Sequence, residues 1–167
     1  MEKIADNISG LLEDTLDLYQ ELRHLLEAEK KYIVEMDVQK LWKATDKKKT
    51  LANSLETVIE KILGQAKQYA SHLEMTVTSF QVREIVSALP LTMRVKSKLK
   101  SIGNKIDACK HEIFLLANEN KRYISEYLSV IDGIFATVVR PPAQEQYSQS
   151  GRILSSNDQN CLINAEV

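Results

Sequence analysis

Few residues in this chain of 167 amino acids have the types and spacing that chemistry requires, and Glu21 and His24 come nearest. Their Glu-x-x-His spacing is the one that di-iron carboxylate bundles use on two helices, together with two further glutamates. Neither His72 nor His111 has a glutamate three residues before it, so a second motif is missing. We therefore expect no metal site and no cofactor, and we interpret the histidines as solvated helix-surface residues.

Other active-site motifs are missing as well. The sequence contains no Gly-x-x-x-x-Gly-Lys phosphate loop and no Gly-x-Ser-x-Gly nucleophile turn. Cys109 and His111 are two residues apart, so on a helix they point to different faces and cannot form a nucleophile–base pair. Cys109 and Cys161 lack metal-ligand spacing and are too few for a disulfide framework. The cysteine usage predicts a protein that stays in a reducing cytoplasm.

The charge pattern excludes other classes of binding protein. The 22 basic and 23 acidic residues nearly balance, which argues against a nucleic-acid partner. The N-terminus has acids where a signal peptide needs bases, and no segment approaches the roughly 20 apolar residues of a membrane span. The lysine triplet at residues 47–49 could form a phosphate or membrane patch, but we favour a solvated helix face. We expect neither nucleic-acid binding nor stable membrane insertion.

The elements that must position any site are helices, because glycine (5) and proline (3) are scarce. Apolar residues at heptad spacing predict a first helix over residues 4–36. Asp37 can cap a new helix, and whether the chain bends there or runs on is left open by the pattern. The second helix is predicted to continue to about residue 73, with Lys48 and Gln65 interrupting its apolar seam.

Two further helices follow. The β-branched and hydroxyl residues at 75–79 break the pattern, and a short helix over residues 80–89 ends at Pro90, which also suits the first turn of the next helix. The last helix has strict four–three apolar spacing and is predicted to run to Val139. Residues 1–36 are acidic and residues 91–122 are basic, which favours pairing of the first and last helices.

The predicted fold is therefore all-α. We expect an elongated antiparallel helical bundle or coiled coil of three long helices and one short helix, over residues 1–140. Residues 141–167 are rich in Gln, Ser and Asn, so we expect a flexible, mostly disordered C-terminal tail. By composition alone, Tyr147 in this tail is part of a solvated linker.

The last helix carries the candidate binding site. A second apolar stripe lies beside its first, and it is either the centre of the bundle or a surface open to a partner helix. Asn120 in the first stripe is either a partner-recognition residue or a buried residue that fixes helix register. The candidate partner-binding residues are Ile113, Leu116, Asn120, Ile124, Leu128, Ile131, Phe135 and Val138.

The order of these features resembles the flagellar export chaperones of the FlgN type. The resemblance covers almost the whole chain, through an acidic leucine-rich helix (LLEDTLDLYQELRHLLEAEKKYI), an Asp-led second helix (DVQKLWKATDKKKTL) and a short helix ending in proline (SFQVREIVSALP). It continues through the end of the long helix (LLANENKRYISEYLSVIDGIF) and a tail with a tyrosine, a glycine and an apolar finish (YSQSG, LINAEV).

The resemblance implies a cytoplasmic chaperone of flagellar type III export that is not an enzyme. We expect a monomer or a weak homodimer. Its clients would be the C-terminal segments of hook-associated (hook-filament junction) proteins, kept from premature association. The client would dock on the C-terminal part of the long helix, and Tyr147 would contact the cytoplasmic domain of the export gate. The alternative hypothesis is a structural coiled-coil homodimer without an export client, with the second stripe as its seam.

Overall fold

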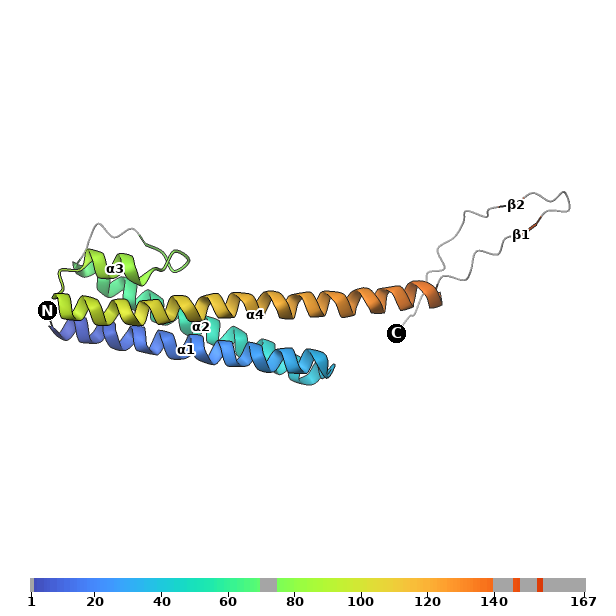
Figure 1. The fold of residues 1–167 in the computed structure, drawn as a ribbon, viewed down its shortest axis with the longest axis horizontal. Coiled ribbons are helices and arrows are strands. Elements are labelled where there is room, and N and C mark those ends of the chain that lie inside the picture. Colours follow the sequence, from blue (N-terminus) through green and yellow to red (C-terminus); the bar gives the residue numbers. More distant parts are fainter. Residues whose placement is uncertain (1, 70–74, 140–145, 148–152, 155–167) are drawn as a thin grey trace, which may run out of the picture. The chain divides into compact units, whose positions relative to one another are not determined.

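The computed structural model describes residues 2–69, 75–139, 146–147 and 153–154. It confirms the all-α prediction of three long helices and one short helix (Figure 1). Among the described residues, no helix combines the length and the apolar character that crossing a bilayer requires. The helices are α1 (Glu2–Val34), α2 (Val38–Tyr69), α3 (Val82–Ala88) and α4 (Met93–Val139).

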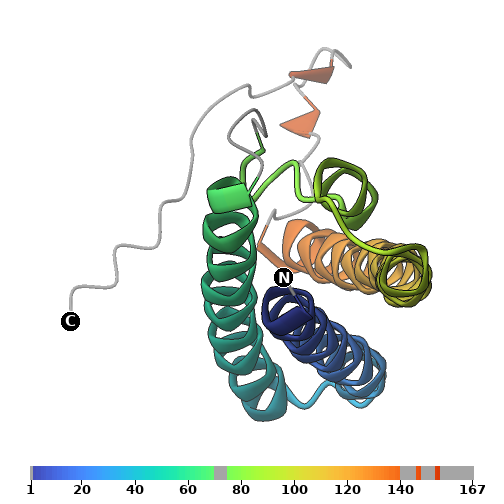
Figure 2. The same cartoon turned by 90° about the vertical axis from the view of Figure 1, so that its left-hand side faces the viewer.

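The chain divides into two compact units, residues 1–124 and residues 125–167. In the first unit, α1 and α2 form an antiparallel hairpin, and α4 runs parallel to α1 and antiparallel to α2 (Figures 1 and 2). Three ion pairs join α1 to α4, and their residue numbers rise together along both helices, as parallel packing requires. The pairs are Glu13–Lys98 at 3.1 Å, Arg23–Glu112 at 2.8 Å and Lys30–Glu119 at 2.8 Å.

The chain turns between α1 and α2 at Met36, whose φ of 53° is the left-handed conformation that ends many helices. Asp37 then caps α2, because its Oδ1 accepts the backbone N–H of Lys40 at 3.0 Å. The Lys40 ammonium lies 2.8 Å from the same carboxylate. The hydrogen bonds from Lys40 lower the pKa of Asp37. The cap predicted at Asp37 is thus present, and the chain bends there.

The main apolar core lies where α3 joins the three long helices. It contains Ile8 and Leu12 of α1, Ile62 of α2 and Ile106 of α4, all inaccessible to solvent, together with the buried face of α3. Gly103 lets α3 approach α4 closely, because a Cβ at this position would lie 3.0 Å from the Cβ and Cγ1 of Val82. This contact fixes the position of α3 beside the first part of α4.

The connections around α3 differ slightly from the prediction. Thr76 N–H donates to the Ser79 hydroxyl at 2.9 Å, so the hydroxyl residues form a local turn where the helical pattern was predicted to break. Pro90, however, precedes α4 instead of occupying its first turn. The first hydrogen bond of α4 runs from Lys96 N–H to the carbonyl of Thr92 at 2.9 Å, so the helix begins after Thr92. The predicted end at Val139 is confirmed.

The second unit contains the end of α4 and two short strands. β1 (Gln146–Tyr147) pairs antiparallel with β2 (Ile153–Leu154), and Tyr147 is opposite Ile153. The other residues of the predicted tail, among them Pro141 and Gly151, lie outside the described part of the chain.

Candidate binding surface

Asn120 lies inside the first unit and contacts α1. Its side chain is 3% exposed, and its amide nitrogen donates to the carbonyl of Leu26 at 2.9 Å and to the carboxylate of Glu29 at 3.1 Å. Glu29 is also buried and accepts a hydrogen bond from Lys48 of α2. The three polar side chains connect all three long helices at one level of the bundle, which is the register-fixing role that a buried Asn can have.

We call Glu29, Lys48 and Asn120 the polar junction, and it explains two interruptions of the sequence pattern. Lys48 breaks the apolar seam of the second helix, and Asn120 breaks that of the last helix. Both face Glu29, because a buried carboxylate needs a charged partner and further hydrogen bonds. The amide oxygen of Asn120 has no hydrogen-bond partner among the described residues.

The remaining predicted partner-binding residues differ in exposure. Ile113 and Leu116 are half-buried in the first unit. The others are exposed side chains spaced four or three residues apart along one face of α4, from Ile124 at 38% to Val138 at 76%. We call these residues the α4 stripe: Ile124, Leu128, Ile131, Phe135 and Val138.

Exposure extends to apolar residues that the sequence placed in the buried seam. Val130 and Ile134 of the second unit, which continue the four–three apolar spacing, are both more than half exposed. Phe114 and Leu115 of the first unit lie outside that spacing and are also more than half exposed. The heptad pattern gave no sign of this, because an apolar residue at a seam position has the same spacing whether or not a neighbour covers it. Contiguous exposed apolar side chains of this kind mark interaction surfaces.

The lysine triplet at residues 47–49 does not form one patch. Lys47 lies 2.8 Å from Glu21 of α1, Lys48 points to buried Glu29, and Lys49 is exposed beside Asp46. Consecutive helix residues point about 100° apart, so three adjacent lysines reach three environments.

The Glu-x-x-His motif also has ordinary surface partners. Glu21 pairs with Lys47, and the ring of His24 lies 3.1 Å from the guanidinium of Arg23. Within residues 2–69 and 75–139 and the two strands, no group of His, Cys, Asp and Glu side chains could hold a metal ion. Burial raises the pKa of the Cys109 thiol, so it is a poor nucleophile.

Tyr147, the predicted export-gate residue, lies in β1, and the position of its side chain is outside what the structure describes.

Comparison with known proteins gives one match. A family model described as FlgN protein matches residues 1–155 and so includes all four helices and both strands. Neither a curated protein nor a solved structure matches the chain.

Proposed function

Because the chain belongs to the FlgN family, whose members are non-enzymatic flagellar export chaperones, we propose that it binds the C-terminal segments of hook-associated proteins. Binding takes place in the cytoplasm and prevents premature association of the clients. The chaperone then delivers them to the cytoplasmic domain of the export gate.

The observation that carries this proposal is the exposed α4 stripe. Five apolar side chains on one helical face are the anchors that an amphipathic client helix needs at i, i+3, i+4 and i+7. Asn120 bonds to α1 and Ile113 and Leu116 are half-buried. The client contacts are therefore assigned to the stripe alone.

The energetics suit a chaperone that must release its client. Covering a half-exposed aliphatic or aromatic side chain contributes about 1 kcal/mol, so the five residues contribute about 5 kcal/mol before the client's own surface is counted. Ordering a disordered client segment costs about 2–5 kcal/mol. The ordering cost thus offsets much of the free energy gained by covering the stripe, which limits the affinity and allows hand-over to the next component.

The stripe is tested by charge substitution. Ile131→Asp or Phe135→Asp places a carboxylate in the apolar contact, and we expect client capture in pull-downs to fall below detection. Ser129→Asp adds the same charge on another face of α4 and serves as the matched control. Far-UV circular dichroism should stay helical for all three variants, and capture by Ile131→Asp at unchanged affinity would refute the assigned stripe.

Tyr147 is proposed as the contact to the export gate. The support is the family resemblance of the YSQSG segment and the separation of β1 from the α4 stripe in the sequence. Tyr147→Ala is expected to leave client capture intact and to reduce binding of the export-gate domain. Loss of both activities together would place Tyr147 in the client site.

A homodimer is the second candidate, and the exposure of Val130 and Ile134 favours it. The α4 stripe would be the seam of this homodimer, and the exposed Val130 and Ile134 would widen the apolar face through which two copies of α4 pair. Light scattering over a concentration series distinguishes the candidates. A monomer or weak dimer that dissociates when client is added supports the chaperone, and a dimer that persists at nanomolar concentration and excludes the client supports the structural role.

A further inference from the structure

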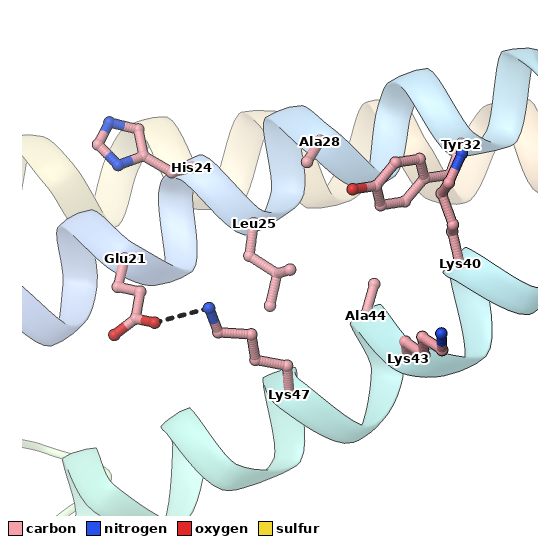
Figure 3. A pocket seen from close by; sticks show the side chains of 9 residues that line it. All are labelled: Glu21, His24, Leu25, Ala28, Tyr32, Lys40, Lys43, Ala44 and Lys47. Atoms are coloured by element: carbon pink, nitrogen blue, oxygen red, sulfur yellow. Dashed lines mark ion pairs between the residues drawn. The ribbon is translucent and has the colours of Figure 1, made fainter.

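A second candidate binding site lies in the groove between α1 and α2, near the turn that joins them (Figure 3). The groove has a volume of about 380 Å³. We propose that it binds an acidic segment of a partner protein. The lining residues are Glu21, His24, Leu25, Ala28 and Tyr32 of α1 and Lys40, Lys43, Ala44 and Lys47 of α2.

The charge on the α2 side of the groove supports this proposal. Lys40, Lys43 and Lys47 lie at i, i+3 and i+7, so they form one row that extends about 10 Å along the helix. Only Glu21 contributes a negative charge to the lining. The groove therefore complements a segment that presents two or three carboxylates at similar spacing.

These amines are accessible to an incoming carboxylate. Among the described residues, Lys43 forms no ion pair. Lys40 pairs with Asp37 and Lys47 pairs with Glu21, both at 2.8 Å and both on the surface. Exposed pairs of this kind contribute about 0–1 kcal/mol, so exchange of one carboxylate for another has little energetic cost.

The floor of the groove favours a peptide over a small anion. Leu25 and Ala44 point into the space between the two helices, and Ala28 lies beside them (Figure 3). The Tyr32 ring lies at one end of the groove, and the Lys40 ammonium lies over this ring, 5.5 Å from its centroid. A phosphate ion needs donors that converge on one point, whereas here the amines are spread along an apolar floor that can accept a side chain.

The site is separate from the α4 stripe, because no residue of α4 lines it. The proposal therefore does not depend on the proposed chaperone function. A client and an acidic partner segment can bind the same molecule at different places.

The experiment uses the full chain and a fluorescein-labelled helical peptide of about four turns, with glutamates at i, i+3 and i+7 and one leucine between them. A peptide with glutamine at each glutamate position is the probe control. Fluorescence anisotropy at low salt should show binding of the acidic peptide alone, and this binding should weaken as salt is raised.

Two charge reversals locate the site. Lys43→Glu should weaken binding about tenfold, the effect of about 1.4 kcal/mol, whereas Lys49→Glu, the same change outside the groove, should leave it unchanged. Amide shifts in NMR spectra should change at Leu25, Ala28 and Ala44. Equal weakening by both variants, shifts confined to α4, or binding of phosphatidylserine vesicles in place of the peptide would overturn the proposal.

Discussion

Replacing Lys48 by methionine tests whether the polar junction holds the three long helices together. The substitution keeps an unbranched apolar side chain in place of the lysine stem but leaves the Glu29 carboxylate, whose side chain is 5% exposed, without its cationic partner. Breaking a buried ion pair costs about 3–5 kcal/mol, and the Lys48 side chain is 31% exposed, so solvent reduces this cost. We expect the free energy of unfolding to fall by about 2 kcal/mol.

Urea unfolding followed by far-UV circular dichroism at neutral pH measures this loss, and thermal unfolding should show a midpoint lower by about 4–8 °C. Lys49→Met is the matched control, because Lys49 is exposed and makes only a 3.9 Å contact with Asp46. The double variant Glu29→Met/Lys48→Met should lose less stability than Lys48→Met alone, since no buried charge remains. Equal effects of Lys48→Met and Lys49→Met would refute the role of the junction.

Three further predictions follow from the described contacts. Gly64→Ala, where a Cβ meets nothing within 4 Å, should stabilise the fold by about 0.5–1 kcal/mol. Gly103→Ala should destabilise the fold, because its Cβ would lie 3.0 Å from Val82. Urea titration of both variants measures the two changes in the free energy of unfolding. Asp37→Ala should lower the melting temperature at neutral pH. The folded pKa of Asp37 is depressed, so its contribution is full above its unfolded pKa of about 3.9 and is lost as pH falls through the folded value; melting curves of both proteins should therefore converge in acid. Cys109, in a background without the other cysteine, should react with a thiol reagent only after urea unfolds the chain, and fast labelling of the native protein would contradict its burial.

The long helices could be predicted because their apolar residues repeat over many turns and their ends carry strong local signals. Asp37 supplies a side-chain cap, and two prolines follow Arg140, where the last helix was predicted to stop. The start of α4 was less predictable, because proline is compatible both with a first helical turn and with the connection that precedes it.

The polar part of the core could not be predicted from spacing. Thr15 and Glu29 of α1 are buried, yet both read as surface residues in a pattern that counts only apolar side chains. Thr15 donates its hydroxyl to the carbonyl of Leu11 at 2.7 Å, and Glu29 depends on residues 19 and 91 positions away. Such partners are brought together only by the tertiary fold.

The sequence predicted that the acidic α1 and the basic α4 pack together, but it did not predict which side chains form ion pairs. Lys98 pairs with Glu13, as expected for a basic helix beside an acidic one. The Arg23–Glu112 and Lys30–Glu119 pairs instead join the minority charge of each helix. Net charge describes a helix as a whole, whereas an ion pair depends on which two side chains face each other.

The parallel register of α1 and α4 also has a consequence for the order of folding. The Arg23–Glu112 and Lys30–Glu119 ion pairs connect residues 89 positions apart, whereas the Lys48–Glu29 contact of the hairpin spans 19 positions. Closing the longer loop costs about 1.4 kcal/mol more chain entropy, so we expect the α1–α2 hairpin to form first and α4 to dock last. During synthesis, we therefore expect Ile8 and Leu12 of the hairpin to lack their contacts with α3 and α4 until α4 has left the ribosome.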